Sequence, residues 1–331
     1  MRASLLVRNE RDIAALQQRT LRVLLAAQVL AGAGLAAGVT VGALLAEDML
    51  HSTGLSGLPA ALLTLGSAAA AVGVGRLSQR AGRRPGLAAG YLVGAVGGTG
   101  VVLAAAIDSV PLLVLSLVLY GSGTATNLQA RYAGADLAAP ERRGRAVSTV
   151  LVATTLGAVA GPNLVEPMGS AAATLGIPRL AGPFLLASAA YALAAVVVSV
   201  QLRPDPLLTA RTVATEAARV AAAAGTAAAS PGVVSTALLR LGATAMIIAQ
   251  LVMVAIMTMT PVHMREHGHG LGAAGLVISV HIAAMFLPSP LTGVLVDRVG
   301  RRGLIALALV PSLLVSRPGR IADGVTAAAR N

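Results

Sequence analysis

The feature that most constrains this chain is a series of long apolar runs, each close to the length that crosses a membrane. A hydrocarbon core of about 30 Å needs about 20 apolar residues in an α-helix. Eight runs approach that length: Leu21–Ala46, Leu58–Val74, Leu87–Ile107, Val110–Leu128, Ala146–Val165, Leu180–Leu202, Leu238–Pro261 and Leu271–Leu291. A ninth, Gly303–Ser316, is too short to span comfortably. Because only 11% of the residues are charged, the sequence predicts an all-α polytopic membrane protein with eight or nine spans.

Arginine is distributed unevenly between the segments that connect these runs. It is abundant before the first run and after the second, fourth, sixth and eighth, and absent after the first and third. Since short basic loops stay on the cytoplasmic side of a membrane, we expect a multi-pass plasma-membrane protein with a cytoplasmic N-terminus. The net charge of +12 is then a feature of topology, and we expect no nucleic-acid partner.

A segment rich in Ala, Thr and Arg, residues 203–237, separates the first six runs from the others. It predicts either a surface helix or a flexible linker between two membrane bundles. The expected organisation is a six-helix bundle over residues 1–202, a cytoplasmic linker over 203–237, a partial second bundle over 238–316 and an atypical polar tail over 317–331.

One ten-residue segment occurs twice, beginning at Gly75 after the second run and at Gly293 after the eighth, with six of its ten positions identical. Repetition at corresponding helices of two bundles indicates an internally duplicated fold. The family resemblance given below implies a role in gating for Gly75, Arg80, Gly82, Arg83 and Arg84 in the first copy, and for Gly293, Asp297, Arg298, Gly300, Arg301 and Arg302 in the second.

The repeated segment resembles the loop signature of the major facilitator superfamily, G-x-L-x-D-R-x-G-R-R. The resemblance implies two six-helix bundles related by a parallel repeat, with transport of small molecules by alternating access. It also implies that the arginines hold the cytoplasmic gate. The first copy departs from the signature, because Gln79 stands at the acidic position that Asp297 occupies in the second copy. We therefore expect weaker locking by charge on that side.

A second local resemblance lies in the fifth run, where Gly157, Gly161 and Pro162 form the pattern G-x-x-x-G-P of the superfamily's drug-exporter branch. The match ends at Asn163, where the branch has small residues. An antiporter-type motif and a helix bent by Gly and Pro for packing remain alternative interpretations. In the fourth run, Leu117 stands where the family has a membrane-embedded arginine, which leaves no arginine for proton coupling at that position.

The stretch after Arg302 is far shorter than the stretch that completes the first bundle after Arg84. Four further helices cannot fit into it. We therefore expect a C-terminally truncated or frame-shifted transporter, with a non-transporting remnant as one alternative.

Polar side chains within the runs are few, and inside a membrane each is a candidate contact for substrate or protons. The candidates are His281, Gln250, Gln28 and Glu166. For the first three, a hydrogen bond between neighbouring helices is the alternative interpretation. Glu166 lies at the end of a run, where a carboxylate needs no function.

Four of the five histidines fall between His263 and His281. His263 and His267 are one helical turn apart, with His269 nearby, and this spacing suits a metal ion. However, the sequence has no Cys, and no carboxylate pair accompanies these histidines. A solvated outer loop is the main expectation, and a metal-binding or metal-transporting membrane protein and a pH-responsive outer gate are the alternatives.

The sequence carries no phosphate-binding loop, nucleophile elbow or zinc-protease signature, so we expect neither an enzyme nor a cofactor. Glycines recur at every fourth position at Gly34, Gly38 and Gly42, which allows close contacts between helices that move against one another. The main hypothesis is a secondary active transporter in the lipid bilayer that exports a small-molecule substrate, with protons as the candidate coupling ion of an antiporter.

Overall fold

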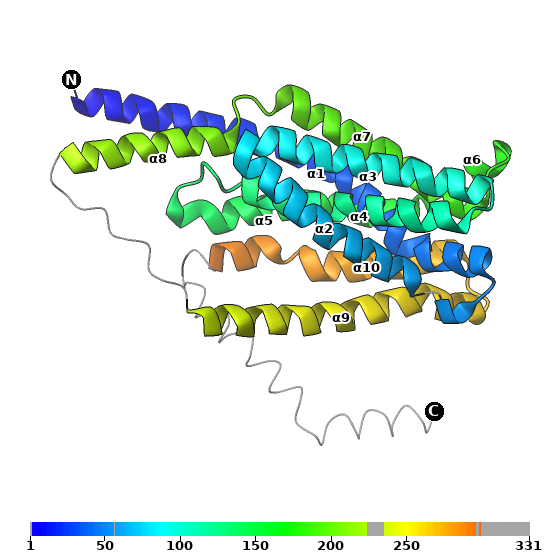
Figure 1. Ribbon diagram of the computed structural model, residues 1–331. Helices are drawn as coiled ribbons and strands as arrows, with labels where there is room; N and C mark the ends of the chain where they lie inside the picture. Colours follow the sequence, from blue (N-terminus) through cyan, green and yellow to red (C-terminus); the bar gives the residue numbers. More distant parts are fainter. Residues whose placement is uncertain (1, 56, 224–234, 296–297, 299–331) are drawn as a thin grey trace, which may run out of the picture.

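The computed structural model describes residues 2–55, 57–223, 235–295 and 298, and over these residues the chain forms helices and turns without strands. The long helices lie side by side along one common direction (Figure 1). They are α1 (Arg2–Leu50), α2 (Leu58–Ala81), α3 (Arg83–Ala106), α4 (Val110–Ala133), α5 (Arg143–Asn163), α7 (Gly182–Gln201), α9 (Thr236–Glu266) and α10 (Leu271–Phe286). The shorter elements are α6 (Val165–Thr174), α8 (Pro206–Ala223) and the 3-10 turns η1 (Thr53–Leu55), η2 (Pro140–Arg142) and η3 (Arg179–Ala181).

Seven helical segments of the described chain are long and apolar enough to cross a membrane, and they match the second to the eighth predicted runs. The first predicted run lies inside α1, a continuous helix of 49 residues. The prediction of an all-helical polytopic membrane protein is therefore confirmed. The ninth run, Gly303–Ser316, lies outside the described residues.

Several helices extend beyond the predicted runs, α2 and α9 among them. Helix α2 continues past Val74 to Ala81, so the first seven residues of the first repeated segment are helical rather than a loop. Helix α9 continues through Pro261 to Glu266. Proline is tolerated inside membrane helices because neighbouring groups satisfy the backbone carbonyl that it leaves free. In the segment predicted to be a linker, residues 206–223 form the surface helix α8, and residues 224–234 lie outside the described residues.

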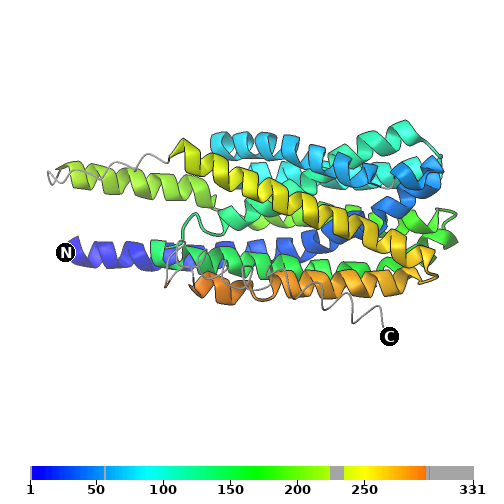
Figure 2. The same cartoon turned by 90° about the horizontal axis from the view of Figure 1, so that it is seen from below.

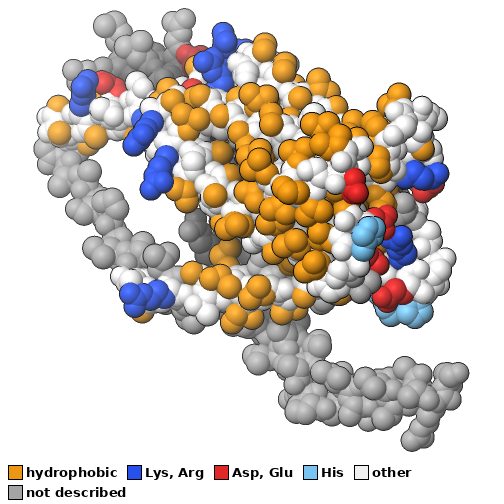
Figure 3. Space-filling model, turned by 45° about the vertical axis from the view of Figure 1, so that its right-hand side comes forward, with side chains coloured by type: hydrophobic (Ala, Val, Ile, Leu, Met, Phe, Trp, Pro, Cys, Tyr) orange, Lys and Arg blue, Asp and Glu red, His pale blue; other side chains and the backbone are white. Residues whose placement is uncertain are grey.

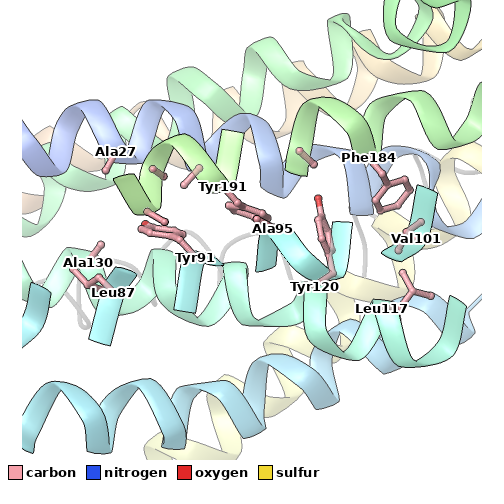
Figure 4. Close-up of a cluster of buried hydrophobic side chains, with 14 of the residues drawn as sticks. Ala27, Leu87, Tyr91, Ala95, Val101, Leu117, Tyr120, Ala130, Phe184 and Tyr191 are labelled. Carbon is pink, nitrogen blue, oxygen red and sulfur yellow. The ribbon is translucent and has the colours of Figure 1, made fainter. Parts of the chain in front are cut away.

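The first six long helices pack around a core of small residues and one aromatic cluster. Helix α1 packs against α5 and α7, α3 packs against α4 and α7, and α2 packs against α4. Tyr91 and Tyr191 stack with ring centroids 6.1 Å apart, and Tyr120 meets Tyr191 and Phe184 edge-on at 5.5 and 5.4 Å (Figure 4). The chain has only four Tyr and two Phe, so most of its aromatic side chains stabilise this bundle instead of a membrane interface.

Glycine permits the closest helix contacts. A Cβ atom at Gly66 on α2 would overlap the carbonyl group of Val118 on α4. A Cβ at Gly157 on α5 would likewise overlap the backbone of Val29 and Ala33 on α1. These backbones approach as small-residue motifs allow in membranes, where association depends on packing instead of the hydrophobic effect.

The second group of helices packs on this bundle through α10, which lies against α5, while α9 contacts α1 (Figure 2). Apolar side chains also cover much of the face of the molecule shown in Figure 3. On α9 they include Met246, Ile247, Ile248, Leu251 and Val252, all more than half exposed. An apolar surface of this extent fits a protein whose solvent is lipid.

Candidate gating site

The site lies at the end of the bundle where α2 meets α3, called here the arginine-rich end because Arg76, Arg80, Arg83 and Arg84 lie there. A single residue, Gly82, separates the two helices. Its φ of 102° lies in a region that residues with a Cβ rarely adopt. Its N–H donates to the Ser78 carbonyl at 2.9 Å, which ends α2 and turns the chain directly into α3.

Arg83 follows this turn, and its side chain donates three hydrogen bonds to two residues. Its Nε donates to Asp136 Oδ2 at 2.8 Å, its Nη2 to Asp136 Oδ1 at 3.2 Å, and its Nη1 to Gln129 Oε1 at 3.1 Å. The two charged side chains are only 9% and 13% exposed. This Arg83 clasp joins the start of α3 to α4 and to the turn that follows α4, with the bidentate geometry that favours Arg over Lys.

The other residues of the first copy surround the clasp. A Cβ at Gly75 would lie 3.5 Å from Gln129 Nε2, an ordinary contact. Arg80 is exposed and Arg84 is half-buried. Gln79 is exposed at the same turn and accepts hydrogen bonds from Arg211 of α8.

The second copy is described only in part. Gly293 is buried against α5, where a Cβ would lie 2.9 Å from Ser148 Cβ and 3.0 Å from the Gly144 carbonyl oxygen. Arg298 is exposed. Four predicted gating residues of this copy lie outside the described residues: Asp297, Gly300, Arg301 and Arg302. The repeated segment therefore makes a close contact between the two helix groups at Gly293.

Pro162, the last residue of the Gly/Pro pattern of α5, also faces the second helix group. A Cβ at Gly275 of α10 would lie 3.0 Å from the Pro162 carbonyl carbon. Next to it, Asn163 Nδ2 donates to Ser279 Oγ at 2.9 Å, and Ser279 Oγ donates to the Val159 carbonyl at 2.9 Å. Asn163, which ends the match to the exporter pattern, thus makes a side-chain hydrogen bond between α5 and α10.

Within the first bundle, Gln28 is fully buried in a polar network. Its Nε2 donates to the Asn127 carbonyl at 3.0 Å, and its Oε1 accepts from the Tyr91 hydroxyl at 2.9 Å. The same hydroxyl lies 3.0 Å from Asn127 Oδ1. In the second helix group, by contrast, Gln250 and His281 are exposed on α9 and α10.

At the opposite end of the molecule, α1 and α9 are joined. Arg265 Nη1 of α9 lies 3.1 Å from Asp48 Oδ1 and 4.0 Å from Glu47 Oε2 at the end of α1. Below these charges, Val262 is buried in one cluster with Ala43 and Leu44. The acidic side chains line an open hollow of about 550 Å³, and acidic, basic and His side chains gather at this end (Figure 3).

The remaining predicted site residues lie near this same end. Glu166 forms an exposed ion pair with Arg179. The rings of His263 and His267 lie 4.2 Å apart, and both residues and His269 are exposed. Within the described part of the chain, no group of three or more His, Cys, Asp or Glu side chains is placed to hold a metal ion.

Sequence reasoning missed several partners that the fold brings together. Asp136 and Gln129, two helical turns apart, could have been read as one face directed at the arginines of the loop. Asp48 and Arg265 fall in segments that the charge alternation assigns to one side of the membrane, which was a usable signal. No comparable signal pointed to the contact between Tyr91 and Gln28, because such a network depends on how each helix is rotated about its axis.

The fold and this site define a class: a polytopic helical membrane transporter with an internally repeated segment. Residues 23–317 match the model of the Major Facilitator Superfamily. The chain is 59% identical over 290 residues to the uncharacterized MFS-type transporter YdeG of Bacillus subtilis, covering 87% of this chain and 67% of the relative. It is 52% identical over 302 residues to the uncharacterized MFS-type transporter YddS of the same organism, covering 91% and 69%.

A more distant relative is the riboflavin transporter RfnT of Brucella anthropi, 30% identical over 295 residues, with 88% of this chain and 70% of the relative covered. The chain therefore belongs to the Major Facilitator Superfamily. It is a multi-pass membrane transporter of small molecules and not an enzyme, as the sequence predicted.

Proposed function

We propose that this chain is a secondary active transporter that exports small molecules by alternating access, with its arginine-rich end in the cytoplasm. The observation that carries the proposal is the Arg83 clasp within the repeated loop. Burying an ion pair gives little stability compared with packing apolar residues, so such a pair is best explained by a role in fixing one conformation. A gate must be held in one defined conformation at each stage of the transport cycle.

The contacts at the opposite end support alternating access. Arg265 and Asp48 are each about half exposed, at 48% and 47%. Exposed ion pairs contribute only about 0–1 kcal/mol, so this contact can form and break during a cycle. The apolar cluster beneath it is small, since Val262 packs there with Ala43 and Leu44. The exposed ion pair and the small apolar cluster therefore close this end through weak contacts only.

The proposed direction and orientation depend on sequence features. The arginine distribution supports a cytoplasmic N-terminus. The Gly157, Gly161 and Pro162 pattern supports export, since it resembles the drug-exporter branch, and its last residue, Pro162, faces α10 across the contact between the helix groups. Under this proposal, Pro162 and Asn163 act where the two groups move against one another.

For the substrate, we propose riboflavin as the first solute to test, because the transporter RfnT is 30% identical over most of this chain. Its intrinsic fluorescence also permits direct measurement. A panel of amphipathic cationic dyes would test the broader export hypothesis, and a pH gradient across the membrane would test proton antiport.

The experiment uses proteoliposomes that contain the purified full chain. We expect faster riboflavin or dye flux than in empty liposomes, a loss of flux in Arg83→Ala, and partial flux in Arg83→Lys, which keeps the charge but not the bidentate geometry. If folded protein moves none of these solutes under any gradient, the proposal of transport by this chain fails, and the non-transporting alternative is favoured. If an imposed pH gradient leaves the flux unchanged, proton coupling is rejected.

A further inference from the structure

The linker helix α8 is attached to the turn between α2 and α3 by Asp205, the residue before its first turn. Asp205 Oδ1 accepts the N–H groups of Leu207 and Leu208 at 3.0 and 3.2 Å. Its Oδ2 accepts the N–H of Arg84 at 2.7 Å. One carboxylate thus caps the N-termini of both α8 and α3, and in each case a negative charge meets the positive end of a helix dipole.

This arrangement is possible because residue 82 is glycine. A Cβ at Gly82 would lie 2.6 Å from Asp205 Cγ and 2.9 Å from Asp205 Oδ1. The carboxylate therefore occupies the space that a larger residue would fill. Among the described residues, no salt bridge involves Asp205, so backbone N–H groups supply its polar contacts.

A second contact joins α8 to the same turn. Arg211 Nη1 donates to the Gln79 carbonyl at 2.7 Å, and its Nη2 donates to Gln79 Oε1. Gln79 stands where the second copy of the repeat has Asp297. The first copy is thus neutral at its acidic position, and a carboxylate from the linker, Asp205, lies on the same turn.

We propose that Asp205 and Arg211 are positioning residues of the gate, and that α8 acts as a strap that fixes the α2–α3 turn. This α2–α3 turn determines the direction of the Arg83 side chain, because Arg83 lies between Gly82 and Arg84, whose N–H is held by Asp205. The linker therefore supplies the acidic contact that the first repeat lacks at Gln79. The effect on transport rests on the proposed function, whereas the effect on the turn does not.

The test uses the absence of Cys from this chain. Ser78 is fully buried beneath the turn, so a single cysteine in Ser78→Cys reports on opening of the turn through its rate of labelling by a maleimide. Asp205→Ala and Arg211→Ala are placed in this background. Arg219→Ala is the matched control, because Arg219 lies on the same helix and pairs only weakly, at 3.8 Å, with Glu216.

We expect labelling to be about 5- to 30-fold faster in Asp205→Ala, the range that the loss of a helix cap produces in an opening equilibrium. Arg211→Ala should have a smaller effect in the same direction, and Arg219→Ala none. Asp205→Asn keeps one acceptor oxygen and should be intermediate, which provides a folded variant if Asp205→Ala is unstable. Unchanged labelling in Asp205→Asn and Arg211→Ala would overturn the strap.

A rescue experiment tests the role assigned to position 79. Gln79→Asp gives Arg211 a charged partner, so it should slow labelling of Ser78→Cys, and it should fail to do so when combined with Arg211→Ala. Equal slowing in both backgrounds would show that Arg211 does not act through this position, and would overturn that assignment.

The same variants without the reporter, measured in proteoliposomes, separate the strap from the transport function. Flux that falls in parallel with the opening of the turn supports the gating role. Faster labelling with wild-type flux would overturn that role and leave α8 a purely structural helix. If wild-type protein transports nothing while labelling responds as expected, the proposed function fails and the strap stands.

Discussion

Replacement of the two charged residues of the Arg83 clasp should show strong energetic coupling. In Arg83→Ala, the Asp136 carboxylate keeps its buried place, 13% exposed, without a cation. Loss of one partner of a buried pair costs about 3–5 kcal/mol. Because the clasp lies at the end of the bundle, where some water reaches it, we expect a loss of about 3 kcal/mol in the free energy of unfolding.

The other two variants complete the cycle. Asp136→Ala should cost less, about 2 kcal/mol, because Arg83 keeps its hydrogen bond to Gln129 and its long side chain can extend toward water. The double variant removes both charges and should cost about 3 kcal/mol instead of the additive 5. The coupling energy is then about 2 kcal/mol, well above the deviation of about 0.5 kcal/mol seen for independent sites.

The assay is unfolding by SDS in mixed micelles, followed by the helical circular dichroism signal. Arg80→Ala is the matched control, since Arg80 lies in the same turn but is exposed; it should change the stability by less than about 0.5 kcal/mol. Additive costs in the double variant, or a control as destabilising as Arg83→Ala, would refute the reasoning that the buried pair holds this turn.

Three further outcomes are expected. A Leu44→Cys and Val262→Cys disulfide in this Cys-free chain should stop transport until it is reduced, because the two side chains close one end together; unchanged flux in the cross-linked protein would argue against this gate. Tyr91→Phe should lower the free energy of unfolding by about 1–2 kcal/mol, because it leaves the buried Gln28 Oε1 without the donor that Tyr91 supplies. Gly157→Ala should cost about 1–3 kcal/mol by overlap with α1, whereas Gly73→Ala, with nothing within 4 Å, should stabilise α2 by up to about 1 kcal/mol.

The membrane helices could be predicted from the sequence because one physical rule dominates them. A span must satisfy its backbone internally and be apolar over about 20 residues, and the runs from Leu58 to Leu291 obey this rule. The ends were less predictable, since α2 continues as a helix past Val74 through polar residues to Ala81. Helical hydrogen bonding and packing on neighbouring helices, rather than apolar character, decide where such a helix ends.

The candidate site was predictable only in its repeated half. Arg83 could be selected from the repeat, but its partner Asp136 and the capping residue Asp205 come from other segments, and their distances depend on how three helices pack. Gln28 also shows that the sequence alone could not determine the role of a polar side chain within a span. The sequence left two interpretations, a residue that lines a cavity and a residue that forms a hydrogen bond between helices. Its burial beside Tyr91 and Asn127 favours the second interpretation.

The distribution of polar groups also narrows how protons could be coupled to transport. Charges are costly within a bilayer, and the first bundle instead uses the neutral network of Gln28, Tyr91 and Asn127 in its interior. Among the candidates named from the sequence, His281 on α10 is the one imidazole in the middle of a span. A proton-coupled cycle should therefore lose its response to an imposed pH gradient in His281→Gln while keeping flux down a substrate gradient. If His281→Gln keeps the full response, the coupling proton binds elsewhere, and the carboxylates Glu47 and Asp48, which line the hollow at the opposite end, become the next groups to replace.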